Sequence, residues 1–161
     1  FVENKGMAWG ARLNDIFPFI SDNTAKLLLS IFRLMAVSAI GYWLVRATKT
    51  ATPKGQLIAV SLIFAGALGN IIDSVFYGVL FSNSYGQIAT FLPAEGGYAP
   101  LMFGHVVDML QFPMFTWTWP DWLPLIGGNN FTFFEPVFNI ADSAISIGVV
   151  LLLLKTRKAK S

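Results

Sequence analysis

The chain has 161 residues, of which 55% are hydrophobic and only 12% are charged. Soluble domains hold roughly 45–50% apolar and about 25% charged residues, so this composition predicts a protein that is largely surrounded by lipid. The sequence contains no cysteine and a single histidine, His105, which excludes disulfides and cysteine nucleophiles and argues against a metal centre built from histidines.

The segment ahead of the first long apolar stretch, residues 1–25, is expected to be ordered. Its first part, residues 1–13, mixes apolar residues with Asn4-Lys5-Gly6, which is a turn signal between two possible short strands.

Three stretches approach the roughly 20 residues that a helix needs to cross ~30 Å of hydrocarbon. They cover residues 26–45, 57–80 and 136–154. Because an isolated strand cannot satisfy its backbone hydrogen bonds in lipid, we predict that all three are helices. In the second stretch Ser61, Ala65 and Gly69 recur every fourth residue, which favours close packing of one helix on another.

The basic residues predict the orientation of these helices. The link RATKTATPKG between the first two stretches and the tail at residues 155–161 are basic and contain no acid, whereas residues 81–135 contain neither lysine nor arginine. The positive-inside rule places the link and the tail in the cytoplasm and residues 81–135 outside. Residues 1–25 then also lie outside, so we expect a further N-terminal helix and four spans in the intact protein. The net charge of +2 therefore indicates membrane orientation and not a nucleic-acid partner.

The long outer connection contains an aromatic piece, FPMFTWTWPDWLPL, with Trp117, Trp119 and Trp122. Such rings favour the lipid headgroup region, so one interpretation places this piece on or in the outer interface. The alternative is a loop that packs over the helices. The sequence leaves both open.

Polar residues at the outer ends of two spans call for an explanation. Asn70 and Asp73 lie near the end of the second span, and Asn139 and Asp142 lie at the start of the third. Each pair has i, i+3 spacing and so shares a helix face. Asp108, between apolar residues of the outer connection, is predicted at the same depth. Carboxylates gathered at a membrane boundary are costly unless they are used.

Helix capping is a structural explanation for one of these pairs. Asparagine is a favoured N-cap, and an acid three residues later suits the helix dipole, so Asn139 and Asp142 are expected to cap the third span. No helix start lies near Asn70 and Asp73, for which hydrogen bonding between helices is the corresponding explanation.

Two carboxylates held close together share a proton near neutral pH, so one can activate water while the other polarises an amide carbonyl. This aspartic-protease chemistry needs neither metal nor cofactor. A Ser-His-Asp triad would have to use His105, and a Ser-Lys dyad Lys5 or Lys26, without a supporting motif. A small transporter or proton-relay protein, or a non-catalytic membrane subunit, remains as an alternative function.

Four blocks in chain order resemble one known family. They are ENKGMAWG (Glu3–Gly10), GNIID (Gly69–Asp73), GHVVDM (Gly104–Met109) and FNIADSAI (Phe138–Ile145). Together they are similar to the motifs of lipoprotein signal peptidase, or signal peptidase II, an aspartyl endopeptidase of the bacterial inner membrane with its active site at the extracytoplasmic face. The resemblance covers essentially the whole chain.

The resemblance implies an all-α polytopic membrane protein with a small extracytoplasmic β-sheet and an interfacial segment, forming a single domain over residues 1–161. It implies cleavage of prolipoproteins before a diacylglyceryl-modified cysteine, contact with membrane lipids and inhibition by globomycin-type compounds. The catalytic pair then corresponds to Asp108 and Asp142, without metal or cofactor. Supporting polar roles fall on Asn4, Gly6, Asn70, Asp73 and Asn139.

Two departures from the family pattern stand out. An arginine usually follows the acid of the second block, whereas here Ser74 follows Asp73. In addition, the usual few residues between the second and third blocks are replaced by the long segment from Val75 to Gly104. Such an insertion suits a lid over the cleft or a partner-binding element.

Overall fold

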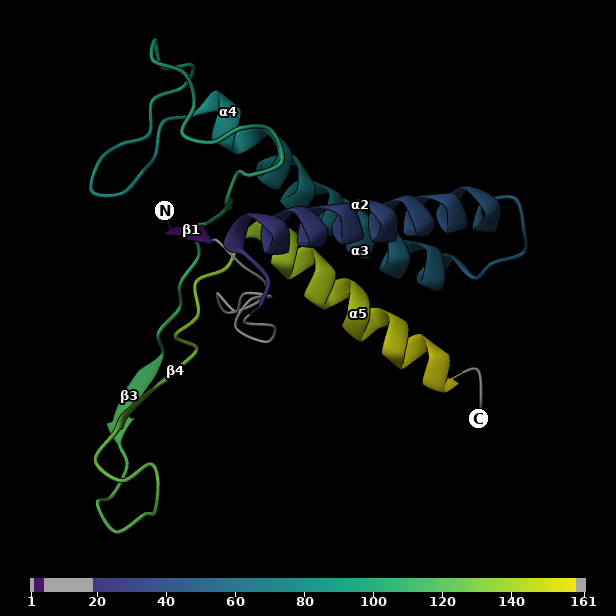
Figure 1. Ribbon diagram of the computed structural model, residues 1–161. Helices are drawn as coiled ribbons and strands as arrows, with labels where there is room; N and C mark the ends of the chain where they lie inside the picture. The colour runs from purple at the N-terminus through teal and green to yellow at the C-terminus, as the bar shows by residue number, and fades with distance from the viewer. Residues whose placement is uncertain (1, 5–18, 159–161) are drawn as a thin grey trace.

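A computed structural model of the chain describes residues 2–4 and 19–158 (Figure 1). Its elements in chain order are β1 (Val2–Asn4), α2 (Asp22–Ala47), α3 (Lys54–Ile72), the π-helical turn η2 (Asp73–Tyr77), α4 (Gly78–Leu80), β2 (Val106–Asp108), β3 (Phe115–Thr118), β4 (Asn130–Phe133) and α5 (Ile140–Lys158).

Two helices of the described chain are long and apolar enough to cross a membrane. They are α2 and the continuous helical run Lys54–Leu80, which includes α3, η2 and α4. The expected spans at 26–45 and 57–80 fall within them. α5 does not meet the same criterion because Asp142 lies near its start and Lys155 and Arg157 near its end. It also runs on into the basic tail that we expected to begin at residue 155.

The distribution of side chains is that of a protein surrounded by lipid. Large apolar residues of α2 point outward, with Phe32 64% and Met35 61% exposed, and no large side chain among the described residues is fully buried. Polar side chains are found among the buried residues, namely Glu3, Ser30, Ser74, His105, Asp108 and Asn139. Water would disfavour both features, whereas hydrocarbon favours both.

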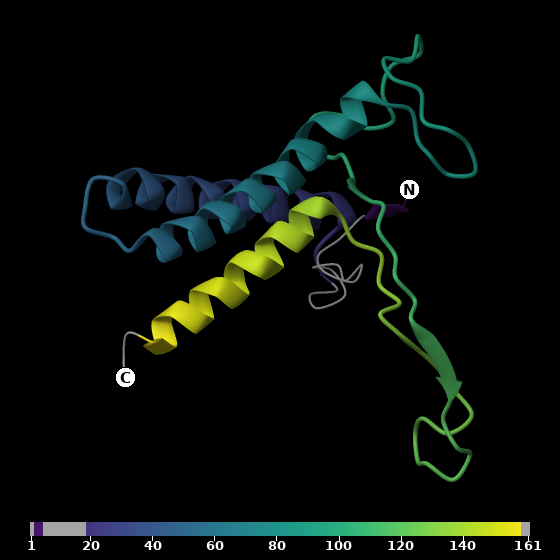
Figure 2. The same cartoon turned by 180° about the vertical axis from the view of Figure 1, so that it is seen from behind.

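α3 packs along α5, and α2 packs on α3 (Figure 2). Glycines permit the closest approaches. A Cβ added to Gly148 would lie 2.6 Å from the Ala59 carbonyl oxygen, and one added to Gly66 would collide with the Ala141 carbonyl. The closest approaches are therefore at Gly66 and Gly148, and not along the predicted stripe of small residues. Gly69 does contact α5, but Ser61 and Ala65 are exposed.

The second span does not end as a regular helix, and the insertion returns alongside it. The backbone N–H groups of Ala99, Met102 and Gly104 donate to carbonyls of Gly78, Val75 and Ser74, each at 3.0 Å. A Cβ on Gly104 would lie 2.7 Å from the Asp73 carbonyl oxygen, so only glycine permits this approach. The returning chain delivers β2 directly beside η2.

β1 and β2 form a small antiparallel sheet in which Val2 pairs with Asp108 and Asn4 pairs with Val106. Asn4 lies in the strand, whereas Gly6 lies outside the described residues. Because side chains alternate across a strand, Asn4 and Asp108 share one face while Glu3 faces the other side.

β3 and β4 form an aromatic hairpin, in which Trp117 pairs with Phe131. This hairpin extends away from the helices in both views (Figures 1 and 2). The interpretation of the tryptophan-rich piece as a loop packed over the helices was therefore wrong. Trp122, in the loop that joins the two strands, is 78% exposed.

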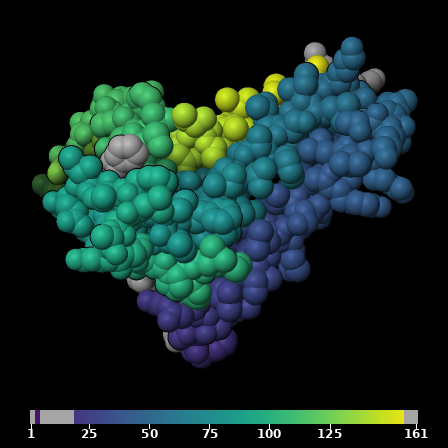
Figure 3. All heavy atoms as spheres, turned by 90° about the horizontal axis from the view of Figure 1, so that it is seen from above, coloured from purple at the N-terminus to yellow at the C-terminus, as the bar shows by residue number. Residues whose placement is uncertain are grey.

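In Figure 3 the long connection, in teal and green, lies at one end of the molecule, and the blue residues around the link between α2 and α3 lie at the other. β1 and the long connection lie at the same end as the start of α5 (Figure 1). The polar residues singled out in the sequence thus come from segments that meet at one end of the molecule.

Replacing Gly66 with valine is expected to destabilise the protein, because the added side chain collides with the backbone of α5. Valine is not a worse helix former than glycine, so any loss must come from packing. We expect a loss of about 1–3 kcal/mol, measured by thermal unfolding in detergent.

Ala65→Val is the matched control, because Ala65 is the preceding residue on the same helix and is exposed. It should unfold at the wild-type temperature. Equal behaviour of the two variants would contradict the assigned packing of α3 on α5.

Candidate active site

Asp142 lies in the first turn of α5 and is fixed there by the residue that caps the helix. The Asn139 Oδ1 accepts a hydrogen bond from the backbone N–H of Asp142 at 2.8 Å. In return the Asp142 Oδ2 accepts one from the backbone N–H of Asn139 at 3.2 Å. This reciprocal arrangement is a capping box. The expected capping role of both residues is confirmed.

The same asparagine joins the two carboxylates that the sequence pairs. Its Nδ2 donates to the Asp108 Oδ1 at 2.9 Å and to the Asn70 Oδ1 at 3.0 Å. The Asn70 Nδ2 in turn donates to the Asp142 Oδ1 at 2.8 Å. Two amides therefore connect Asp108 to Asp142, and both Asn139 and Asp108 are buried.

Backbone pairing explains why Asp108 and Asn139 meet. The N–H of Leu110 donates to the Phe138 carbonyl at 2.8 Å, and the N–H of Phe138 donates to the Leu110 carbonyl at 2.9 Å. This bridge holds the chain that leaves β2 against the chain that enters α5. It brings together two motifs that are separated by the whole aromatic hairpin.

The second oxygen of Asp108 is held from β1, where the Asn4 Nδ2 donates to the Asp108 Oδ2 at 3.1 Å. Burial raises the pKa of Asp108 above its ordinary value, and the hydrogen bond from Asn4 only partly offsets this. The charge of Asp142 raises the pKa further, against the hydrogen bond from Asn139. The raised pKa makes Asp108 suited to hold a proton.

Asp73 is the first residue of η2, and it holds the strand that carries Asp108. Its Oδ2 accepts a hydrogen bond from the backbone N–H of Val107 at 3.2 Å. The structure thus places Asp73 against the backbone of β2, while Asn70, one turn earlier, contacts Asp142 directly. The two members of this i, i+3 pair have different neighbours.

A buried Glu3–His105 pair on the other face of the β1–β2 sheet was not singled out from the sequence. The His105 Nδ1 lies 2.6 Å from the Glu3 Oε2, and the His105 Nε2 lies 3.1 Å from the Lys26 Nζ. An ammonium group only donates, so Nε2 accepts and Nδ1 carries the proton toward Glu3. The histidine thus links the β1–β2 sheet to α2.

The same carboxylate also anchors the insertion. The Glu3 Oε1 accepts hydrogen bonds from the N–H and the hydroxyl of Ser84, at 2.8 and 2.6 Å. The Tyr98 hydroxyl accepts from the backbone N–H of His105 at 2.8 Å. Alternation along ENK and HVVD was the available signal, because it separates Glu3 and His105 from Asn4 and Asp108.

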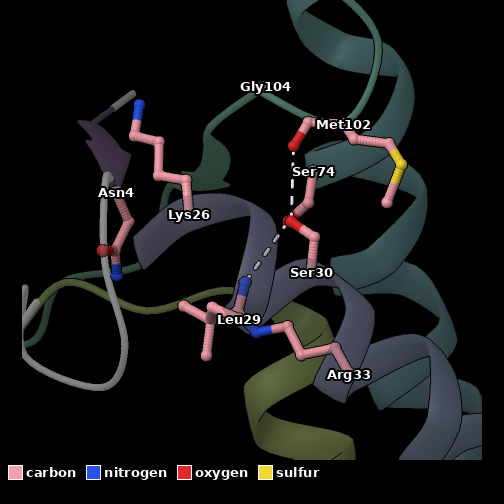
Figure 4. A pocket seen from close by; sticks show the side chains of 8 residues that line it. All are labelled: Asn4, Lys26, Leu29, Ser30, Arg33, Ser74, Met102 and Gly104. Carbon is pink, nitrogen blue, oxygen red and sulfur yellow. Dashed lines mark hydrogen bonds between the residues drawn. The ribbon is translucent and has the colours of Figure 1, made fainter. Parts of the chain in front are cut away.

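A small pocket lies beside the carboxylate site and is lined by Asn4, Lys26, Leu29, Ser30, Arg33, Ser74, Met102 and Gly104 (Figure 4). Its walls come from β1, α2, η2 and the returning insertion. Asn4 contributes to both this pocket and the site at Asp108.

These features define a helical membrane protein with an amide-bridged pair of aspartates, the buried Asp108 and the half-buried Asp142, at one end of its helices. The family model described as signal peptidase (SPase) II matches residues 1–158, and the chain belongs to that family.

Named relatives agree with this assignment. The chain is 49% identical over 155 residues to a lipoprotein signal peptidase of Porphyromonas gingivalis, covering 96% of this chain and 64% of that protein. It is 39% identical to one from Amoebophilus asiaticus, covering 98% of this chain and 60% of the relative. The chain thus spans less than two thirds of the length of these relatives. No solved structure matches it.

The Glu3–His105 pair predicts acid sensitivity of the fold. Burial disfavours the charged form of Glu3, but the hydrogen bonds from His105 and Ser84 outweigh it, so the pKa of Glu3 lies below its ordinary value of 4.5. A carboxyl with a lowered pKa contributes stability above its unfolded pKa and loses it as the pH falls through the folded value. Unfolding temperature should therefore fall below about pH 4.5 in wild type and much less in Glu3→Gln.

At neutral pH we expect Glu3→Gln to cost about 1–3 kcal/mol, because a buried hydrogen-bonded charge is removed. Glu135→Gln makes the same chemical change at an exposed position and should follow the wild-type profile. Thermal scans across the acid range measure both. Identical acid profiles for wild type and Glu3→Gln would refute the assignment.

Proposed function

We propose that this protein is a membrane aspartyl endopeptidase that removes signal peptides from prolipoproteins, cleaving before the diacylglyceryl-modified cysteine. The observation that carries the proposal is the amide bridge of Asn139 and Asn70 between Asp108 and Asp142. It joins residues from three motifs at one point. Membership in the signal peptidase II family and the names of the relatives support the same activity.

In the proposed mechanism Asp142 acts as the base and Asp108 as the acid. The ionised Asp142 takes a proton from a water molecule, and the resulting nucleophile attacks the scissile carbonyl. The protonated Asp108 donates a hydrogen bond to the carbonyl oxygen as negative charge develops there. Asp142 then returns its proton to the leaving amine as the C–N bond breaks. The raised pKa of Asp108, which results first from burial, favours this division of roles.

The remaining predicted site residues act in support. Asn139 and Asn70 position the two carboxylates, Asn4 holds the second oxygen of Asp108, and Asp73 holds the backbone of β2. Gly6 lies outside the described residues, and its supporting role stays a prediction.

We place the chain in the bacterial inner membrane as a single domain over residues 1–161, with α2, the run Lys54–Leu80 and α5 as three spans. The basic link between α2 and α3 then faces the cytoplasm, and the β1–β2 sheet faces outward. The common end of the non-helical segments supports this orientation (Figure 3). Lysines and arginines near the end of α5 suit the cytoplasmic interface.

The substrate reaches this site along the membrane. Its two acyl chains stay in the outer leaflet, its signal peptide lies among the helices, and its scissile bond meets the aspartates at the boundary. The aromatic hairpin, with Trp117 and exposed Trp122, then lies in the outer headgroup region. Globomycin-type inhibitors are expected to occupy the same cleft.

A transporter or proton relay would need ionisable residues through the depth of the bilayer. Asp73, Asp108 and Asp142 instead come from segments that meet at one end of the helices, and the relatives are named as peptidases. These observations do not support the alternative.

Asp108→Asn and Asp142→Asn should each abolish cleavage of a diacylglyceryl prolipoprotein. Each change keeps the size of the side chain but removes the acid or the base, so we expect kcat/KM to fall by about 10²–10⁴-fold. A gel-shift assay with protein expressed from its complete gene, in detergent or lipid, measures the rate.

Unfolding temperatures establish that the variants fold, and Asp121→Asn, at an exposed position on the hairpin loop, is the matched control. Wild type that leaves a lipidated substrate uncut would refute the proposed activity. A folded Asp108→Asn or Asp142→Asn variant with near-normal activity would refute the assigned pair.

A further inference from the structure

Arg33 is a charged residue within the apolar helix α2. Its helical neighbours Phe32 and Met35 are strongly exposed, as expected for side chains that face lipid, whereas Arg33 is half-buried and lines the pocket beside the active site. A cation at such a position is costly. In membrane proteins such a residue faces the interior of the helix bundle, where it pairs with another polar or charged group.

The structure shows what the guanidinium approaches. The Arg33 Nη1 donates to the Ser74 Oγ at 3.4 Å (Figure 4). The Ser74 Oγ donates in turn to the Asn70 carbonyl at 2.9 Å. The Ser74 hydroxyl thus accepts a hydrogen bond from the arginine and donates one to the helix backbone, so it acts both as acceptor and as donor. Asn70 is the residue whose amide holds Asp142.

The charge of Arg33 also interacts with the charge of Asp142. Two further carboxylates, those of Asp73 and Asp108, lie in the same cluster. The cation next along α2, Lys26, is directed toward the Glu3–His105 pair on the other face of the sheet. The guanidinium of Arg33 therefore provides positive charge near Asp142 from α2.

We infer that Arg33 is a positioning residue of the active site, which balances the charge of Asp142 and steadies Asn70 through Ser74. This inference rests on the proposed peptidase function. Ser74 occupies the place where an arginine usually follows the acid of this motif, and in this chain the guanidinium that approaches the place comes from α2. The active site thus receives its positive charge from a different helix.

The expected consequence is electrostatic. Positive charge near a carboxylate pair favours its singly ionised, active form. Without the guanidinium, the pair takes up its second proton at a higher pH. The acid limb of the pH profile of kcat/KM should therefore move to higher pH in Arg33→Gln, by about one unit or more. Activity below the limb should fall at least about tenfold.

Arg33→Lys keeps the charge, although not the geometry, and should leave the acid limb near its wild-type position. Arg46→Gln is the matched control, because it removes the same charge from the same helix about 20 Å away, at a rise of ~1.5 Å per residue. It should leave the profile unchanged. A merely structural role for Arg33 would lower the amount of folded enzyme without moving the limb.

The double variant Arg33→Gln/Ser74→Arg returns the guanidinium to the same space from the neighbouring helix. We expect it to recover cleavage and the wild-type acid limb relative to Arg33→Gln. This variant also decides the matter if Arg33→Gln does not fold, because a folded double variant with an active, wild-type profile supports the inference.

Cleavage by wild type tests the proposed function separately from this inference. If wild type cleaves and Arg33→Gln cleaves with the same kcat/KM and the same acid limb, the inference is overturned while the peptidase assignment stands. A folded double variant that does not cleave overturns it as well. Wild type that fails to cleave removes the proposed function on which the inference rests.

Discussion

The carboxamide of Asn139 is the interaction on which the rest of the site depends. Its oxygen caps α5, and its nitrogen donates to both Asp108 and Asn70. One side chain therefore sets the start of a helix and the separation of two carboxylates. Loss of its amide would free the first turn of α5 and leave buried acceptors unpaired, which is costly in a medium without water.

Different backbone features bring each motif to the Asn139 amide. The helix that carries Asn70 continues into a π-helical turn, whose freed carbonyls pair with the returning insertion and so place β2 beside it. The Leu110–Phe138 bridge then holds β2 against the start of α5. The insertion also stabilises the sheet. Its Ser84 is hydrogen-bonded to Glu3 of β1, on the face of the sheet opposite the aspartates.

The sequence predicts the features that follow from local chemistry. The apolar stretches predicted the helices, and the spacing of Asn139 and Asp142 predicted the capping box. Helices and capping box alike depend on residues that are close in the chain. The sequence did not reveal the Glu3–His105 contact or the approach of Arg33 to Ser74, since each joins segments brought together only by packing. The same limit explains the small-residue stripe: spacing shows that a close face exists, but Gly66 and Gly148 show where the partner helix lies.

A neutral bridge suits a pair of acids better than a charged one. A lysine at position 139 would place a positive charge beside the carboxylates. That charge would favour the state in which both are ionised and neither can donate a proton. The Asn139 amide instead holds the Asp108 Oδ1, and the Asn70 amide holds the Asp142 Oδ1, without adding a charge to the pair. A positive charge farther from the pair then shifts the protonation equilibrium of the two carboxylates. Arg33, which is connected to Asp142 through the hydrogen bonds of Ser74 and Asn70, provides such a charge.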